Sequence, residues 1–182
     1  MVPVFDDAPR RVYWEVTRAC DLACRHCRAE AAPSADPAEL SPEEGRRLLH
    51  ALTRFGEPRP HLVLTGGDPL KRGDLFALIE TAKALGFPVA VAPSGTPRLT
   101  AEEIRRLKAA GVEAISLSID GADRGRHDGL RGVPGCFDRT LAAARECVVA
   151  GLPFQINTLV SEETLDDLSA IHRLAVGLGA LR

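Results

Sequence analysis

Three cysteines lie within eight residues near the start of the chain, in the segment CDLACRHC at Cys20, Cys24 and Cys27. Closely spaced thiolates on one loop can converge on one metal centre, because soft sulfur ligands suit iron–sulfur clusters and zinc. A structural zinc site normally takes four ligands, yet the next thiol along the chain is Cys136, and His26 is poorly spaced to serve as the fourth. Three thiolates on a four-iron cluster would leave one iron open to a substrate or cofactor. The spacing therefore favours a catalytic cluster over a structural site.

Two short turns that follow apolar runs offer further groups for a ligand. The first is Gly66-Gly67-Asp68-Pro69. Glycines without a Cβ let a ligand approach the backbone, and a carboxylate can receive an ammonium group. A tight turn before a helix is the alternative for this segment. The second turn contains Ser94 between a proline and a glycine, and a ligand-binding loop and a simple turn fit this pattern equally well.

Polar side chains also recur within two apolar runs. Because side chains alternate along a strand, Ser116, Ser118 and Asp120 share one face. Gln155 and Asn157 share one face of a later run. A polar row on a buried strand needs partners, and a polar ligand would supply them. For Gln155 and Asn157, an amide pair satisfied by the backbone is the alternative.

An alternation of strand and helix patterns must position these groups. Apolar runs indicate strands at Val12–Thr17, Leu62–Thr65, Val89–Ala92, Ala114–Ile119 and Phe154–Val160. Helices are expected to begin at Ser41, Thr100 and Thr164, with Asp74 and Asp138 as further caps, and to stop at Gly56, Gly86, Gly111 and Gly151. Five strand–helix units imply a parallel sheet, either open and doubly wound or part of a βα barrel. In both architectures ligands bind at the carboxyl ends of the strands.

Two long loops follow predicted strands, at residues 28–40 and 120–137, and loops of this length are usually functional. In the second loop, Arg124, Arg126 and Arg131 either meet substrate carboxylates or form a solvated basic surface. His127 is expected to form hydrogen bonds within this loop.

The composition indicates an ordinary globular domain over residues 1–182, with 45% hydrophobic residues, 26% charged residues and a net charge of −2. Without a basic excess, nucleic acid and anionic membranes are not favoured partners. No transmembrane stretch or secretory signal is expected. We therefore expect a cytoplasmic chain with reduced thiols, in which Cys136 is an exposed residue without a ligand role and Cys147 is a small core residue.

The segment CxxxCxxC, the GGDP turn and the S-x-D-G element at Ser118–Gly121 together resemble the radical SAM superfamily. The resemblance extends from Arg11 to the end of the chain. It implies a partial (βα)6 barrel whose three cysteines hold a [4Fe–4S] cluster, with S-adenosylmethionine as the second cofactor. In this family, one-electron reduction cleaves S-adenosylmethionine to methionine and a 5′-deoxyadenosyl radical, which abstracts hydrogen from the substrate.

The resemblance also implies which residues contact the cofactor. Asp68 replaces the Glu of the common GGEP motif, and Gln155 stands where relatives commonly have Lys or Arg. The expected contacts are His26, Gly66, Gly67, Asp68, Pro69, Ser94, Ser118, Asp120, Gln155 and Asn157. The segment from His127 to Phe137 is similar to the branch that contains SPASM-type and haem-pathway proteins. That similarity implies a peptide or tetrapyrrole-like substrate and an electron donor such as a flavodoxin or ferredoxin.

The strand count departs from the family pattern, because five of the six βα units are present. We expect either a truncated chain or a partner chain that completes the barrel. An unpaired edge at the fifth strand predicts self-association. Two alternatives to an active enzyme remain: an inactive fragment, and a non-catalytic module that holds zinc or an electron-transfer cluster.

Overall fold

Five parallel strands form one sheet in the computed structural model, which describes residues 8–181. The strands are β1 (Arg11–Thr17), β2 (His61–Gly66), β3 (Val89–Val91), β4 (Ala114–Ser118) and β5 (Phe154–Asn157). Each strand pairs in parallel with the next one along the chain. All five coincide with apolar runs that the sequence predicts as strands, so the parallel α/β architecture is confirmed.

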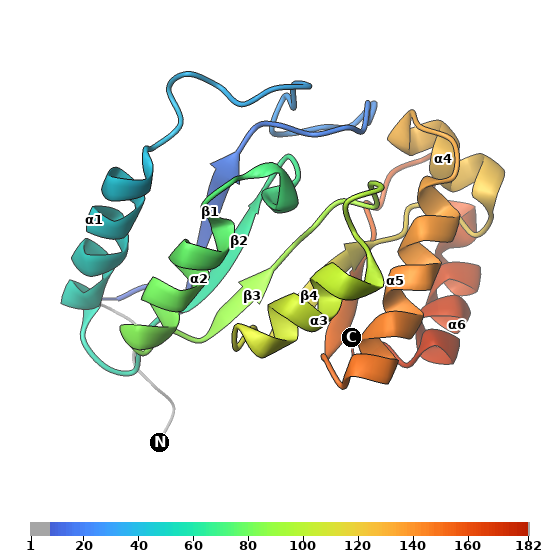
Figure 1. Ribbon diagram of the computed structural model, residues 1–182. Helices are drawn as coiled ribbons and strands as arrows, with labels where there is room; N and C mark the ends of the chain where they lie inside the picture. The colour runs from blue at the N-terminus through green and yellow to red at the C-terminus, as the bar shows by residue number, and fades with distance from the viewer. Residues whose placement is uncertain (1–7, 182) are drawn as a thin grey trace.

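The strand order β1-β2-β3-β4-β5 decides between the two predicted architectures. A doubly wound sheet reverses its strand order and carries helices on both faces. An unreversed order with right-handed crossovers places all the helices on one side, as in a βα barrel. The helices are α1 (Pro42–Leu52), α2 (Leu75–Ala84), α3 (Ala101–Ala109), α4 (Arg124–Arg131), α5 (Cys136–Ala150) and α6 (Leu168–Leu178). The fold is therefore a partial βα barrel (Figure 1).

The two faces of the sheet differ in polarity, and this difference positions the site. Leu62, Ile115 and Leu117 are at most 1% exposed and pack in the main apolar core with residues of the covering helices. The opposite face of β4 carries Ser116 and Ser118, as the alternation predicts. Because the helices cover the apolar face, the polar face is free to line a cavity. Within residues 8–181, no helix is both long and apolar enough to cross a membrane.

Most of the predicted helix boundaries are confirmed. The Ser41 hydroxyl accepts a hydrogen bond from the backbone N–H of Glu44, whose side chain accepts one from the backbone of Ser41. The Thr100 hydroxyl accepts a hydrogen bond from the Glu103 amide at 3.2 Å. The four predicted stop glycines all have positive φ angles, between 62° and 84°, which a glycine adopts without strain. Local capping chemistry therefore predicts these helix ends well.

Two predicted aspartate caps are wrong in their chemistry. Asp74 precedes α2, but its carboxylate pairs with Arg72 at 2.7 Å and makes no cap hydrogen bond. Asp138 lies inside α5 and pairs with Arg124 at 2.8 Å, while Gly135 precedes the helix. In both cases a neighbouring guanidinium is a stronger partner for the carboxylate than a backbone amide.

The segment 120–137 is not a loop throughout, because it contains α4. The Asp123 carboxylate caps this helix by accepting a hydrogen bond from the Arg126 amide at 3.0 Å. The helix ends at Gly132, which has a left-handed φ of 71°. Two glycines inside the helix lower its intrinsic propensity, which is why the composition suggested a loop. The aspartate cap and the terminal glycine outweigh that effect.

β5 ends at Asn157, three residues before the predicted end at Val160. The Leu159 amide donates to the Asp120 carboxylate at 2.8 Å. The Thr164 hydroxyl donates to the Leu159 carbonyl at 2.6 Å instead of capping α6, which begins later, at Leu168. These two bonds draw the chain away from the line of the strand.

The outer edge of β5 is partly covered by the chain itself. The Pro153 carbonyl accepts a hydrogen bond from Ile115 of β4, and the Asn157 carbonyl accepts one from Ile119, just after β4, so the intervening Phe154 carbonyl faces away from β4. The Leu181 amide donates to this Phe154 carbonyl at 2.9 Å. The self-association that the sequence suggested for this edge stays a prediction.

Candidate active site

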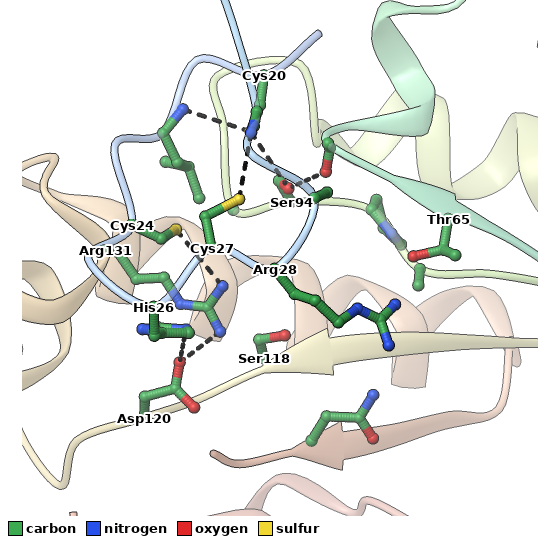
Figure 2. A pocket seen from close by; sticks show the side chains of 18 of the residues that line it. Cys20, Cys24, His26, Cys27, Arg28, Thr65, Ser94, Ser118, Asp120 and Arg131 are labelled. Atoms are coloured by element: carbon green, nitrogen blue, oxygen red, sulfur yellow. Dashed lines mark hydrogen bonds and ion pairs between the residues drawn. The ribbon is translucent and has the colours of Figure 1, made fainter. Parts of the chain in front are cut away.

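A cavity of about 390 Å³ lies at the carboxyl ends of the strands, within the size range of small-molecule sites. Each strand, or the residue that follows it, contributes to the lining, through Glu15, Thr65, Ala92, Ser118 and Asn157. The loop after β1 closes one side of the cavity (Figure 2). The cavity therefore lies where parallel βα folds place their chemistry.

All three thiols of the CxxxCxxC segment line this cavity. Cys20 is buried, whereas Cys24 and Cys27 are half-buried. The backbone amide two residues after Cys20 donates to its sulfur, and the amide four residues after Cys27 does the same, both at 3.4 Å. Hydrogen bonds to the ligand sulfurs are one of the features by which proteins tune an iron–sulfur cluster. Burial raises the pKa of the Cys24 thiol, and the neighbouring charge of Arg131 opposes that rise.

The arrangement of these thiols fits an iron–sulfur cluster better than a single ion. Among the residues that the structure describes, no three His, Cys, Asp or Glu side chains are close enough to bind one metal ion. A tetrahedral zinc site needs four ligands around one point. The thiolates of a cluster bind different iron atoms and need not converge on one point.

The GGDP turn after β2 packs directly against the backbone that follows β1. Gly66 has a φ of 130°, and a Cβ at this position would lie 2.2 Å from the Thr17 carbonyl oxygen. A Cβ on Gly67 would lie 2.5 Å from the Ala19 carbonyl oxygen. The Gly67 amide donates to the Thr17 carbonyl at 2.8 Å. Both glycines line the cavity, and their immediate physical role is to let two backbones approach each other.

Asp68 and Pro69 do not line the cavity, although the sequence predicts both as cofactor contacts. Asp68 is fully buried and accepts a hydrogen bond from the Thr96 hydroxyl at 2.7 Å. It also accepts one from the Ser94 amide at 3.4 Å. The Ser94 hydroxyl, which does line the cavity, donates to the Gly67 carbonyl at 2.8 Å. The Asp68 carboxylate thus faces the protein and positions the Ser94 loop.

The predicted polar row on β4 and β5 faces the cavity. Ser116, Ser118, Asp120 and Asn157 are all part of the lining. Gln155 is not, because its amide nitrogen instead donates to the Asn157 side-chain oxygen at 3.0 Å. Gln155 is therefore linked to the cavity through Asn157.

Asp120, which follows β4, contacts the cysteine loop through His26 and the end of α4 through Arg131. The side chain of Asp120 is 1% exposed, and it lies 2.5 Å from Arg131 Nη2 and 3.4 Å from His26 Nε2. Arg131 is half-buried, lines the cavity, and lies between Cys24 and Asp120 (Figure 2), so it does not belong to a solvated basic surface. Its contact with a substrate carboxylate stays a prediction. Burial lowers the pKa of His26, and the charge of Arg131 lowers it further.

His127 and Cys136 form a second buried pair beside the cavity. The Asp120 amide donates to His127 Nδ1 at 3.1 Å, so the ring carries its proton on Nε2. That nitrogen lies 3.4 Å from Cys136 Sγ. Burial lowers the pKa of His127 to about 4 and raises the pKa of the Cys136 thiol to about 11. The expectation of an exposed Cys136 is wrong, because it is buried and lines the cavity.

Sequence reasoning missed several residues of the lining, among them Glu15, Thr65 and Arg28. Glu15 and Thr65 are register partners on β1 and β2. Their polar side chains alternate with apolar ones, a signal that could have identified them. Arg28 Nη2 lies 2.9 Å from Glu15 Oε1. No sequence pattern pointed to Arg28, because it follows the cysteine segment in an irregular loop.

Comparison with known proteins agrees with this geometry. The model of the radical SAM superfamily matches residues 14–175. The chain belongs to the radical SAM superfamily. It is 42% identical over 170 residues to an AdoMet-dependent heme synthase of Nitratidesulfovibrio vulgaris, covering 93% of this chain and 46% of that protein. It is 32% identical over 175 residues to the mycofactocin maturase MftC of Mycolicibacterium smegmatis, covering 96% of this chain and 43% of that protein.

The solved structure of Streptococcus suis SuiB bound to S-adenosylmethionine shares the fold, with a TM-score of 0.79 at 17% identity. The matched region covers 94% of this chain and 39% of the SuiB chain. The chain spans about half the length of the curated relatives that it matches. The predicted placement in the SPASM-like and haem-pathway branch is confirmed. This radical SAM chain is an enzyme domain whose cofactors are a [4Fe–4S] cluster and S-adenosylmethionine.

Proposed function

We propose that this domain generates the 5′-deoxyadenosyl radical of a longer radical SAM enzyme, with Cys20, Cys24 and Cys27 as the cluster ligands. The observation that best supports this proposal is the placement of these three thiols with Gly66 and Gly67 around one cavity at the strand ends. When bound, the cluster supplies the electron that cleaves S-adenosylmethionine, and the resulting radical abstracts hydrogen from the substrate.

Uncharged hydrogen-bonding groups on the strand ends form part of the surroundings proposed for the cofactor. The Ser118 hydroxyl and the Asn157 amide come from adjacent strands and face the same space. Ser94 adds a hydroxyl from the loop after β3. Such groups can form hydrogen bonds with the amino, carboxylate and ribose groups of a polar cofactor. Of the expected contacts that lie outside the cavity, Asp68 positions Ser94 and Gln155 positions Asn157, each through a hydrogen bond.

We propose a tetrapyrrole bearing propionate groups as the substrate, with a peptide as the second candidate. The higher identity to a heme synthase than to a peptide maturase supports this order. Arg28 at the cavity is exposed, and its ion pair with Glu15 contributes little to stability. A substrate carboxylate can therefore replace Glu15 on the Arg28 guanidinium at low cost.

We also propose an electron donor and a segment that completes the barrel. A cytoplasmic flavodoxin or ferredoxin supplies the electron. A further segment completes the barrel beside β5, supplied either by the rest of a longer protein or by a second chain. The single hydrogen bond from Leu181 to Phe154 marks where such a segment would begin to pair.

The radical-generating role is tested by anaerobic reconstitution of the chain with iron and sulfide, followed by dithionite and S-adenosylmethionine. We expect 5′-deoxyadenosine from the wild type and from Cys147→Ala, but none from Cys24→Ala. Cys147 is the matched control because it is buried in the main core and does not line the cavity. Cluster binding without cofactor cleavage would favour the inactive fragment. Zinc retained at about one ion per chain without iron uptake would favour the metal-binding module.

The substrate class is tested in the same assay by adding a propionate-bearing iron porphyrin, its propionate methyl ester or a peptide. We expect the free acid, but not the ester, to increase 5′-deoxyadenosine formation in the wild type. We expect this increase to be weaker in Arg28→Gln. An increase with the peptide alone would replace the tetrapyrrole proposal and leave the radical-generating role intact.

A further inference from the structure

Arg131 occupies a position that neither the cysteine segment nor the polar strand row explains. Its side chain is 14% exposed, and Nη2 lies 2.5 Å from the Asp120 carboxylate. Nη1 donates toward Cys24 Sγ at 3.8 Å. Its Nε has no hydrogen-bond partner among the residues that the structure describes. A buried guanidinium is thus held between one of the cysteine thiols and a carboxylate (Figure 2).

The main chain fixes the distance between Arg131 and Cys24. The Ala23 amide donates to the Arg131 carbonyl at 3.1 Å, and the Arg25 amide donates to the Leu130 carbonyl at 3.0 Å. The two amides that flank Cys24 are therefore both bound to the last turn of α4. Because the backbones of the two segments are bound together, the charge at Arg131 does not depend on a flexible surface side chain for its position.

A fixed charge beside a cluster ligand affects the energy of electron uptake. A thiolate-ligated cluster gains one negative charge when it is reduced, and nearby charges and hydrogen bonds to sulfur set its potential. The guanidinium of Arg131 favours the more negative, reduced state, whereas the carboxylate of Asp120 opposes it. The ionisable groups that the structure places around this pair are Cys24, His26, His127 and Cys136. Arg131 contacts the Cys24 sulfur directly, with Nη1 at 3.8 Å.

We propose that Arg131 and Asp120 form a charge pair that sets the reduction potential of the cluster through Cys24, with Arg131 raising the potential and Asp120 lowering it. This inference rests on the proposed function, because it requires the cluster at these three thiols. Arg131 is a positioning residue in this proposal, since it acts on the cluster through the sulfur of Cys24. The pair also links the cluster loop to the end of β4 through one carboxylate.

The test is a redox titration of the reconstituted cluster in the absence of S-adenosylmethionine, followed by visible absorption and electron paramagnetic resonance. We expect Arg131→Gln to lower the one-electron equilibrium constant for reduction about tenfold, a shift of about 59 mV to more negative potential. We expect Asp120→Asn to shift the potential in the opposite direction. Arg124→Gln is the matched control, because Arg124 is an exposed residue on the same helix. It should leave the potential unchanged.

The opposite signs separate an electrostatic role from a structural one. Iron and sulfide content and circular dichroism establish that each variant is folded and loaded before its potential is compared. If Arg131→Gln does not fold, Asp120→Asn alone decides, and a shift to more negative potential or no shift overturns the inference. Shifts of the same sign in both variants also overturn it. A wild-type chain that takes up no cluster would count against the proposed function instead.

Discussion

The loops at the cavity and the surface of α5 and α6 on the far side of the sheet are built in opposite ways. At the cavity, buried charged side chains are paired across elements, as in the Arg131–Asp120 pair. On α5 and α6, apolar side chains face outward, and Val148, Val149 and Val176 are 58%, 80% and 64% exposed. The first region depends on close contacts between distant segments. The exposed valines have few neighbours with which they must pack. Substitutions should therefore have large effects near the cavity and small effects on the α5–α6 surface.

The strongest test of this comparison is Gly66→Ala. Its Cβ would lie 2.2 Å from a backbone oxygen of Thr17, at a φ of 130°. We expect a loss of at least about 3 kcal/mol in the free energy of unfolding of the cluster-free chain, because neither backbone can move without breaking the β1–β2 junction. Urea denaturation followed by circular dichroism measures it. Gly73→Ala, where nothing lies within 4 Å of the added Cβ, is the control. Equal stability of the two variants would contradict the prediction.

A second glycine tests the contact between α4 and the cluster loop. Gly132 has a φ of 71°, and a Cβ there would lie 2.4 Å from the Ala23 carbonyl oxygen. We expect Gly132→Ala to cost about 2 kcal/mol of stability and to reduce iron uptake, because the loop that carries Cys24 must shift. Gly129→Ala, inside the same helix with nothing within 4 Å, should stabilise by about 0.5–1 kcal/mol. Normal iron content in Gly132→Ala would show that the loop does not depend on this contact.

The buried His127 predicts a specific loss of stability in acid. Its folded pKa of about 4 lies below the ordinary value of 6.5, so between these two pH values the unfolded chain binds a proton that the folded chain does not. Stability therefore falls as the pH falls through this window, by about 2 kcal/mol between pH 7 and 5. Urea denaturation at both pH values should show a smaller difference for His127→Asn. The control is His172→Asn on the exposed face of α6, which should keep the wild-type difference.

The smallest effect is expected on the α5–α6 surface. We expect Val149→Ser to change the free energy of unfolding by less than about 0.5 kcal/mol, because the side chain is mostly in solvent. If the chain self-associates through this surface, the substitution should also shift its sedimentation toward the monomer. A destabilisation as large as that of Gly66→Ala would remove the contrast between the two regions.

Patterns within short segments predicted much of this molecule. Apolar runs identified five strands, and alternation placed Ser116 and Ser118 on one face of β4 and Asn157 on one face of β5, the faces that line the cavity. Spacing placed the three thiols on one loop at a strand end. These predictions succeeded because strand periodicity, helix caps and metal-ligand spacing are local properties of the chain.

Contacts between distant segments were not predictable in the same way. The GGDP turn suggested that Asp68 faces a ligand. In the structure its carboxylate instead points into the protein and accepts a hydrogen bond from Thr96. Arg131 is separated from Cys24 by 107 positions, and no pattern in either segment predicts their contact. The helix that carries Arg131 was itself hidden by two internal glycines.

The sequence by itself determined the superfamily, the parallel βα order and the cluster segment, because each depends on residue types at fixed short spacing. The tertiary structure decided which polar side chains face the cavity and which form hydrogen bonds or ion pairs that fix the loops. That choice depends on burial and on the competition between charged partners from different segments. It is also what places a guanidinium beside one cluster cysteine and leaves the valines of α5 and α6 exposed.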